Sequence, residues 1–466
     1  MSGRLIVVSN RIPTEAEPSG GLVVALHDCL SERGGLWIGA HPETADDGDI
    51  PHALEPLDGA KGSDKAAFRL SKSDEEDYYL GYANSVLWPL SHRRTDLISI
   101  RHQYADAYVR VNQRVAKLVA EVARPGDTIW VQDYHFYPLA RFLRQEGFNG
   151  PIGFFLHIPF PTLSDLRALP ERDEFLDWVV AFDLVGVQTK ADVTRVVNVF
   201  RGHDTDEFFA DGRVTNGDES VAVQAFPIGI DVDAFCETAA EGDGEDLIGR
   251  PDSERLLIGA DRLDYSKGIP NRFRAFAEWL ERREDVHRRA TLLQIAPPSR
   301  SEVPAYRQVT EELEMLAGTI NGRYAELDWT PIRYIHRAIP RETIAKLFRT
   351  ARAGLVTPLA DGMNLVAKEF IAAQDPDDPG VLILSETAGA AEDMQDALLV
   401  NAYDVTDIAG AIDTALHMPW EERKARYDKL IEAVRATDIS QWSAKFLDAL
   451  GEAADHKADG PALRLA

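Results

Sequence analysis

The stretch LLIGADRLDYSKGIP, residues 256–270, joins a strand-like run to the start of a helix. The continuously apolar run LLIGA is typical of a parallel strand that is covered on both faces. Pro270 is a residue favoured in the first turn of a helix. Two cations, Arg262 and Lys267, lie in the short connection. A strand that leads through a charged loop into a helix predicts an α/β unit that binds ligands where the strand ends.

Similar apolar runs alternate with amphipathic segments along the whole chain. The first set is LIVVS, TIWV, IGFFLHI, LVGV and VAVQAF, and the second set is LLIGA, TLLQI, IRYI, GLVT, VLIL and LLV. Helical periodicity is clear in residues 104–123 and 303–317. The fold class indicated is α/β, with two facing, doubly wound, Rossmann-like domains and the site in the cleft between them.

The length of 466 residues exceeds what one ordinary core holds. A polar, Gly-rich break at residues 241–254 follows FPIGIDVDAF (226–235), and we expect the domain joint in this region. The predicted domains are residues 1–230 and 231–438. Residues 439–466 are expected to form a helix that crosses back to the first domain, followed by a tail.

Composition excludes several classes of function. The net charge of -27 argues against nucleic acid or an anionic membrane as a partner. Cys29 and Cys236 lie far apart, and the chain has no CxxC or HExxH motif, which fits a reducing cytoplasm without a structural zinc site. The N-terminal MSGRLIVVSNR is expected to be a first strand rather than a secretory signal, and no apolar stretch reaches membrane-spanning length.

The loop with Arg262 and Lys267 indicates a phosphate site. A phosphate there would meet two cations and a helix N-terminus, all of which favour an anion. The alternative is that Arg262 forms an ordinary surface ion pair with Asp261 or Asp264. This segment alone leaves both interpretations open.

A second charged segment, LVTPLADGMNLVAKEFIAAQD, covers residues 355–375. A strand leads to a turn at Asp361, and a helix is expected to start near residues 363–364. Asp361 and Glu369 suit vicinal sugar hydroxyls, because each carboxylate oxygen can accept a separate O–H. The alternative makes Lys368 and Glu369 solvated residues of the helix surface.

Other polar residues also follow predicted strands. Arg11 comes after the first strand, and Gly20-Gly21 precede a helix-like run, although GxGxxG is absent. Asp133 and His157 fall at strand ends, in VQDYHF and FFLHIPFPT. A histidine within an apolar run is more often a satisfied core residue. The two prolines that follow favour a strand end exposed at a cleft.

Two further patterns are ambiguous. The aromatic cluster in DYYLGYANSVLWP (77–89) fits a core, and flat rings also stack on sugars. The DxD within DDGD (46–49) could suggest a metal site, but it lies in a polar loop with no strand before it. We therefore predict no metal at that position.

Taken together, these segments resemble the trehalose-6-phosphate synthase family, retaining glucosyltransferases of family 20 with the GT-B architecture. The resemblance runs from VVSNR (7–11) to about residue 455. The blocks that carry it are SGG, YY…N..LWP, DYH, GFFLHIPFP, PIGI, RLDYSKG, INGRY…DWTP, TPL.DGMNLVAKE..AAQDP and LS..AGAA. The resemblance implies transfer of glucose from UDP-glucose to glucose 6-phosphate, without a metal or cofactor, by a homo-oligomer.

The resemblance also implies roles for individual residues. The catalytic residues would be Arg262, Lys267, Asp133 and His157. The donor-binding residues would be Gly20 and Gly21, Arg262 and Lys267 on the diphosphate, Glu369 on the ribose, and Asp361, Met363, Asn364, Leu365 and His157 on the glucose. The acceptor-binding residues would be Arg11 and Arg300 on the phosphate, with Tyr79, Trp88 and Asp133 lining the pocket.

The sequence departs from the family pattern at four places, three of which are expected near the acceptor region or the rim of the cleft. They are Ala40 in WIGAHPE, Gln132 before DYH, Ala360 in TPLADG, and SHRR at residues 91–94. They leave open a sister transferase with another phosphorylated acceptor, such as glycerol 3-phosphate. A catalytically silent nucleotide-sugar-binding regulator and a sugar-nucleotide epimerase are further alternatives. The identity of the nucleotide base, UDP, GDP or ADP, is also open.

Overall fold

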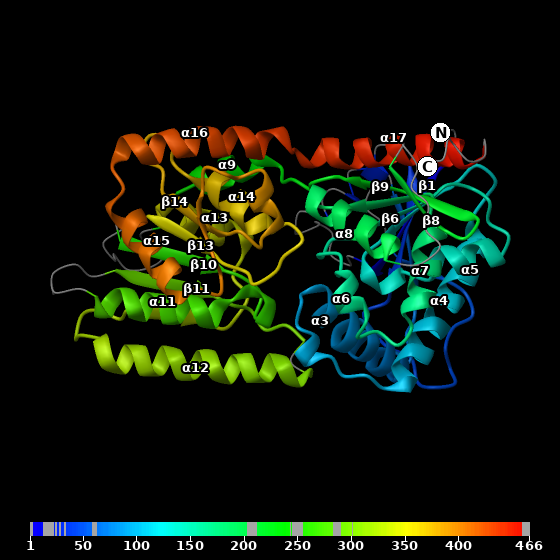
Figure 1. Cartoon of the computed structure of the whole chain (residues 1–466), viewed down its shortest axis with the longest axis horizontal. Helices are drawn as coiled ribbons and strands as arrows, with labels where there is room; N and C mark the ends of the chain where they lie inside the picture. The colour runs from blue at the N-terminus through cyan, green and yellow to red at the C-terminus, as the bar shows by residue number, and fades with distance from the viewer. Residues whose placement is uncertain are drawn as a thin grey trace. The chain divides into compact units, whose positions relative to one another are not determined.

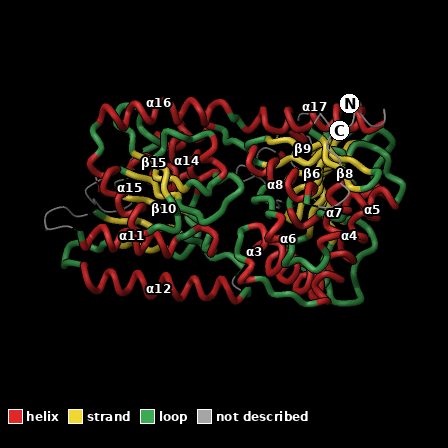
Figure 2. Tube along the Cα trace, in the orientation of Figure 1, coloured by secondary structure: helices red, strands yellow, loops and turns green. Residues whose placement is uncertain are grey.

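The computed structural model describes residues 3–12, 23, 26–27, 29–31, 34–57, 63–202, 212–242, 244, 255–282, 290–300 and 302–458. The chain forms two compact units, Met1–Pro227 with Ile439–Ala466, and Ile228–Asp438. The boundary between the units lies after residue 227, whereas the sequence predicts it after residue 230. The chain returns to the first unit after residue 438, the predicted end of the second domain. In both units, strands gather in the interior and helices cover them (Figure 2).

The first unit is built on a large sheet. Its strand order among the described residues is β3-β4-β2-β1-β5-β6-β7-β9-β8. The bounds are β1 Leu5–Arg11, β2 Gly35–Ala40, β3 Glu55–Leu57, β4 Ser63–Phe68, β5 Thr128–Gln132, β6 Ile152–Phe155, β7 Leu184–Val187, β8 Arg213–Asn216 and β9 Glu219–Ala225. Pairing is parallel except between β3 and β4 and between β8 and β9, so the two antiparallel pairs lie at the edges.

Helices of the first unit connect and flank these strands. They are α2 Lys72–Asp74, α3 Trp88–Ser91, α4 His102–Val122, α5 Leu139–Gln145, α6 Leu163–Leu166, α7 Arg172–Val180, α8 Lys190–Arg201 and α17 Ile439–Ala458, with a π-helix at Glu75–Leu87. The C-terminal helix α17 packs on the sheet through its aromatic face. Phe446 stacks on Trp130 at a ring-centroid distance of 4.7 Å, and Trp442 meets Phe155 edge-on at 4.8 Å.

The second unit holds a parallel sheet with the order β12-β11-β10-β13-β14-β15 among the described residues. The bounds are β10 Leu256–Ala260, β11 Thr291–Ile295, β12 Ile332–Ile335, β13 Ala353–Val356, β14 Val381–Ser385 and β15 Leu398–Val400. Its order steps outward from β10 in both directions, which is the doubly wound topology. The predicted α/β class is therefore confirmed, with a parallel sheet in each unit.

Helices cover both faces of this second sheet (Figure 1). They are α9 Val232–Ala240, α11 Ile269–Glu281, α12 Pro304–Tyr324, α13 Arg341–Thr350, α14 Leu365–Ala373, α15 Val405–His417 and α16 Trp420–Ala436. Helices α11 and α12 lie on one side, and α9, α14 and α16 lie on the other. The core beneath them includes Leu257, Phe273, Phe276, Leu292 and Ile383, all fully buried.

The chain enters and leaves the second unit at one point. A Cβ atom at Gly229 would lie 1.4 Å from the carbonyl oxygen of Thr437, so only glycine fits against this backbone. Lys368 of α14 donates from Nζ to the Ile228 carbonyl at 2.8 Å and to Thr437 Oγ1 at 3.0 Å. One buried ammonium therefore binds both crossings of the chain.

Candidate active site

The loop after β10 is a tight, capped turn. Asp264 accepts a hydrogen bond from the Ser266 N–H at 2.9 Å and so caps a 3-10 turn at Tyr265–Lys267. Gly268 follows at φ 66 and begins α11, and a Cβ there would come within 2.3 Å of the Thr357 carbonyl oxygen. Glycine is required because this close backbone approach and the positive φ both exclude a side chain. The turn therefore holds Lys267 beside the loop after β13.

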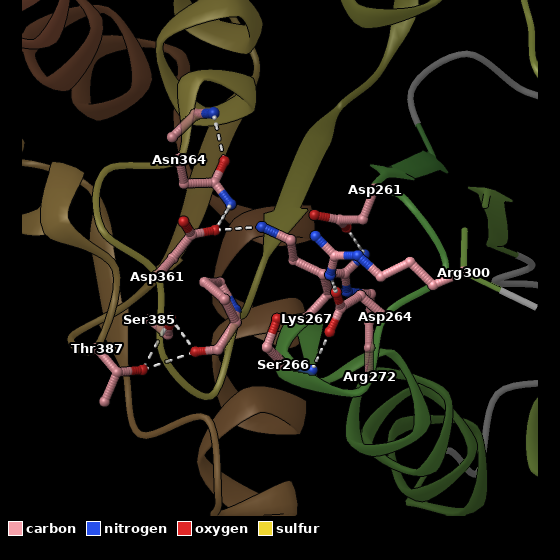
Figure 3. Close-up of polar contacts among 12 residues, drawn as sticks. Asp261, Asp264, Ser266, Lys267, Arg272, Arg300, Asp361, Asn364, Ser385 and Thr387 are labelled. Atoms are coloured by element: carbon pink, nitrogen blue, oxygen red, sulfur yellow. Dashed lines mark hydrogen bonds and ion pairs between the residues drawn. The ribbon is translucent and has the colours of Figure 1, made fainter. Parts of the chain in front are cut away.

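Lys267 meets a carboxylate from that neighbouring loop. Its Nζ lies 2.5 Å from Asp361 Oδ2, and both side chains are 13% exposed. Asn364 donates from Nδ2 to the same oxygen at 3.0 Å (Figure 3). Asn364 has φ 81 and caps α14, because its Oδ1 accepts from the Ala367 N–H at 3.3 Å. Three residues predicted for donor binding therefore form one hydrogen-bonded cluster.

Arg300 joins the loop after β11 to the same turn. Its Nη1 lies 3.4 Å from Asp264 Oδ2 and 2.5 Å from the hydroxyl of Tyr306, which donates to that carboxylate oxygen at 3.0 Å. Arg300 has φ 47, a backbone conformation rare for a residue with a side chain. Its side chain is 8% exposed. Asp264 thus contacts both the turn that carries Lys267 and the predicted acceptor-side arginine.

A second buried arginine binds the strand ends together. Arg272 of α11 donates from Nη1 to Asp261 and to Gln294, both at 2.8 Å, and from Nε to Thr357 at 3.2 Å. These contacts link the ends of β10, β11 and β13 through groups that are almost fully buried. Asp261 pairs with Arg272 and Asp264 pairs with Arg300, so both carboxylates considered as partners of Arg262 bind a buried arginine. The side chain of Arg262 is exposed.

The helix after the Asp361 turn carries two contrasting charges. Glu369 is half-buried and pairs with Arg341 Nη2 at 2.9 Å, while burial raises the pKa of its carboxyl. Lys368 is 1% exposed, and burial lowers the pKa of its ammonium to about 8. The alternative that made Lys368 a solvated surface residue is therefore wrong. Its helix packs with α9, α13 and α16, so the side chain has protein rather than water around it.

In the first unit, two predicted residues lie together after β5 and β6. Asp133 has φ 73, and its Oδ1 accepts from the backbone N–H of His157 at 3.2 Å. The His157 ring lies between two amides, with Nε2 2.9 Å from Gln132 Oε1 and Nδ1 3.5 Å from Gln188 Nε2. Burial lowers the pKa of His157 to about 3, so its ring is neutral near pH 7.

The predicted acceptor aromatics form part of a packed layer. Arg11 is exposed at the end of β1 and donates from Nη2 to the Tyr79 hydroxyl at 3.0 Å. Tyr79 stacks on His135 with ring centroids 5.9 Å apart. Trp88 is 4% exposed and packs on His92 at 4.2 Å. The structure therefore brings Arg11 and Tyr79 into contact and places Trp88 mainly within the core.

The remaining residues that the sequence singles out lie as follows. Gly20 and Gly21 lie outside the described residues. Met363 is buried, and Leu365 is the first residue of α14. Within the DxD, Asp47 is used locally, since its Oδ1 accepts from the Ser73 hydroxyl at 2.8 Å. Within the described part of the chain, no group of His, Cys, Asp or Glu is arranged for a metal, and no helix is long and apolar enough to cross a membrane.

Sequence reasoning missed the residues that orient the site. They are Asp264, Tyr306, Gln188 and Arg341. Asp264 lay within the quoted stretch, and a short polar residue before a turn is a capping signal. The other three contact their partners from distant elements, so no local pattern indicates them.

Comparison with known proteins identifies the family of this chain. The family model for glycosyltransferase family 20 matches residues 4–452. A trehalose-6-phosphate synthase of Sodalis glossinidius (strain morsitans) is 42% identical over 454 residues, which covers 96% of each chain.

Two solved structures were crystallised with ligands. One, from E. coli and bound with UDP-2-fluoro glucose, matches with a TM-score of 0.91 and 39% identity, over 96% of this chain and 99% of that one. The other is an alpha,alpha-trehalose-phosphate synthase (UDP-forming) from Burkholderia xenovorans in complex with glucose-6-phosphate. It matches with a TM-score of 0.90 and 39% identity, over 96% and 100% of the two chains. The sequence, the fold and the charged strand ends thus lead to one conclusion, that this chain belongs to glycosyltransferase family 20.

Proposed function

We propose that this protein transfers glucose from UDP-glucose to glucose 6-phosphate with retention, giving α,α-trehalose 6-phosphate and UDP. The observation that carries the proposal is the end-to-end likeness to trehalose-6-phosphate synthases, 42% identical over 96% of the chain. The ligands of the two related structures, UDP-2-fluoro glucose and glucose-6-phosphate, match the proposed donor and acceptor. A regulator or an epimerase would not require arginines suited to a second phosphate.

The donor is assigned to the second unit. Arg262 and Lys267 bind the diphosphate, with Gly20 and Gly21 of the first unit closing over it. Glu369 accepts from the ribose hydroxyls. Asp361 and the backbone of Met363, Asn364 and Leu365 hold the glucose, which His157 also contacts. The geometry suits this assignment, because Lys267 and Asp361 already lie 2.5 Å apart and so present a cation and an acceptor side by side.

The acceptor is assigned to two arginines and a set of rings. Arg11 and Arg300 bind its phosphate, since guanidinium groups bind phosphate oxygens in pairs. Tyr79, Trp88 and Asp133 line the rest of the pocket. Arg11 is held by its hydrogen bond to Tyr79, and the side chain of Arg300 is mostly buried. Both observations support two guanidinium groups that are already positioned before the acceptor binds.

The reaction is proposed to take place on one face of the donor sugar. The bond between the anomeric carbon and the phosphate oxygen breaks as the acceptor hydroxyl oxygen bonds to that carbon. The departing phosphate oxygen takes the proton of this hydroxyl, so no protein base is required. Arg262 and Lys267 stabilise the charge that develops on the leaving diphosphate, which is the largest contribution asked of the protein. The His157 ring is neutral, so it can form hydrogen bonds with the sugar hydroxyls without adding charge to the site.

The decisive experiment is a matrix of substrates read by nucleotide release. UDP-, ADP- and GDP-glucose are each incubated with glucose 6-phosphate, glycerol 3-phosphate or no acceptor. The proposal expects the fastest release with UDP-glucose and glucose 6-phosphate, and a product with an α,α linkage. Faster release with glycerol 3-phosphate would favour the sister transferase, and nucleotide binding without turnover would favour the regulator.

The proposal includes three further properties. The enzyme works without a bound metal, because side-chain cations neutralise the diphosphate, so turnover in excess EDTA equals turnover in Mg²⁺. It acts in the cytoplasm, where both substrates are available. It assembles into a homo-oligomer, a dimer or tetramer, which sedimentation of the purified protein measures directly.

A further inference from the structure

The ion pair between Arg341 and Glu369 uses only one of the two carboxylate oxygens. Arg341, the first residue of α13, donates from Nη2 at 2.9 Å and from Nε at 3.3 Å, and both bonds go to Oε1 of Glu369. Oε2 makes no hydrogen bond with any residue in the described part of the chain. A carboxylate offers acceptor sites on both oxygens. One oxygen is therefore held by protein while the other is left for a ligand.

Arg341 is itself held in place from a third helix. Its guanidinium lies 4.9 Å from the ring centroid of Phe235 in α9, at a distance suited to a cation–π contact. Helices α9, α13 and α14 pack on one another, so the ring, the guanidinium and the carboxylate come from three mutually supporting elements. A planar guanidinium held on one side by a ring and on the other by a carboxylate has little freedom to turn.

The surroundings of Glu369 make this partner necessary. Its side chain is 16% exposed, and burial raises the pKa of the carboxyl. The charge and hydrogen bonds of Arg341 act in the opposite direction and favour the ionised form. An ionised carboxylate accepts hydroxyl hydrogen bonds more strongly than a protonated one. Arg341 thus contributes both the orientation and the charge state of Glu369.

We propose that Arg341 is a positioning residue for the nucleotide: by holding Oε1 of Glu369, it presents Oε2 to the ribose hydroxyls. The inference rests on the proposed function, in which Glu369 binds the ribose. It assigns Arg341 an effect on nucleotide recognition that operates only through those hydroxyls. In the proposed function, the diphosphate and the glucose are assigned to other residues.

The test compares two nucleotides that differ only in those hydroxyls. Calorimetry measures the affinity of the full-length protein for UDP and for 2′,3′-dideoxy-UDP. The wild type is expected to prefer UDP by about 10- to 100-fold, as for hydrogen bonds to a charged group. Arg341→Gln and Glu369→Gln are each expected to reduce this ratio to below about 3-fold. Arg341→Lys should give an intermediate ratio, because one ammonium cannot reproduce the two-nitrogen contact.

Arg349→Gln is the matched control. Arg349 lies on the same helix and pairs with Asp375 at 2.7 Å, so this variant also removes an arginine from an ion pair of α13. It should keep the wild-type ratio. Melting temperatures of all variants show whether a change in ratio accompanies a loss of folding, and a well-folded Arg341→Lys serves if Arg341→Gln does not fold.

Each outcome decides something different. If Arg341→Gln keeps the wild-type ratio while Glu369→Gln loses it, Arg341 is not a positioning residue. If the wild type binds both nucleotides equally, Glu369 does not read the ribose and the inference fails, while the transferase assignment stands on its substrate matrix. If UDP, ADP and GDP all fail to bind the wild type, the proposed function itself fails. Where ADP or GDP binds best, the ratio is measured with that nucleotide and its dideoxy form.

Discussion

The strand ends of the two units use different chemistry. In the second unit they carry ion pairs, such as Lys267 with Asp361 and Arg300 with Asp264. The first unit also has charged groups there, Arg11 and Asp133, but its rings make neutral contacts, such as His157 between two amides and Tyr79 stacked on His135. Ion pairs allow several cations to be fixed in one loop region before an anion arrives. Amides and rings fix orientation without adding charge, which suits the uncharged parts of a sugar.

The contrast predicts where substitutions act. Removing a cation from the strand ends of the second unit should slow the reaction, because developing charge loses its partner. Changing a neutral contact in the first unit should mainly alter orientation and stability. The predictions that follow run from the largest expected effect to the smallest.

Lys267→Ala tests the charged side most severely. We expect turnover to fall by about 10²–10³-fold, since the leaving diphosphate loses one stabilising cation. Lys429→Ala is the control, because it removes an exposed lysine paired with Asp396 in the same unit and should leave turnover unchanged. Steady-state rates of UDP release measure both, and a near-normal rate for Lys267→Ala would remove this lysine from the mechanism.

Arg300→Ala tests whether this arginine acts on the acceptor or on the donor. We expect the KM for glucose 6-phosphate to rise by about 10- to 100-fold, as for loss of a charge-assisted contact. The KM for UDP-glucose should change much less. Arg274→Ala, in an exposed pair with Glu312, should alter neither. Equal increases in both constants would show that Arg300 supports the loop generally and does not bind the acceptor.

Lys368 should make the free energy of unfolding depend on pH in the alkaline range. Burial lowers its pKa from 10.5 to about 8, so between these values the unfolded chain binds the proton that the folded chain has released. The free energy of unfolding should therefore rise from pH 8 to 10.5, by up to about 1 kcal/mol per pH unit. Urea titrations of Lys368→Met should lack this rise. An identical slope in both proteins would contradict the burial argument.

His157 gives the first unit a smaller pH dependence of the same sign, at acid rather than alkaline pH. Its pKa is lowered from 6.5 to about 3 by burial, so its neutral ring stabilises the fold above pH 6.5. That contribution should be lost as the pH falls from 6.5 towards 3, by less than about 1 kcal/mol per pH unit because the ring is half-buried. His157→Asn should show a shallower acid slope in the same urea titration, and an unchanged slope would contradict the prediction.

Much of the fold was predictable because its strands are continuous apolar runs. All eleven predicted runs, from LIVVS to LLV, coincide with strands of the two sheets. Strands β2, β3, β4 and β8 were missed. Strand β4, SDKAAF, lacks an apolar run, and β3 and β8 are short edge strands. Strand β3 is only partly buried, so its sequence carries a weak hydrophobic signal. Strand β8, RVTN, is mostly buried but contains a single apolar residue, Val214.

The candidate site was predictable where a residue follows its own strand. Lys267, Asp361 and Arg300 were all identified from local sequence or from the family resemblance. Their mutual contacts were not foreseen, because Lys267 meets Asp361 across 94 residues of chain. The same holds for Arg341, which reaches Glu369 from another helix. Local pattern thus names the charged residues, while the packing of helices on the sheet decides which of them pair.

The contact of Gly229 with Thr437, together with the Lys368 hydrogen bonds, has a practical consequence. Since residues 228 and 437 adjoin, the second unit is topologically an insert with neighbouring ends. Such an insert can be excised as one piece, and a linker of a few residues can rejoin Pro227 to Ile439. Domains with neighbouring ends tolerate exchange well. This junction therefore offers a site for building chimaeras in which the second unit of a relative replaces Ile228–Asp438 of this chain.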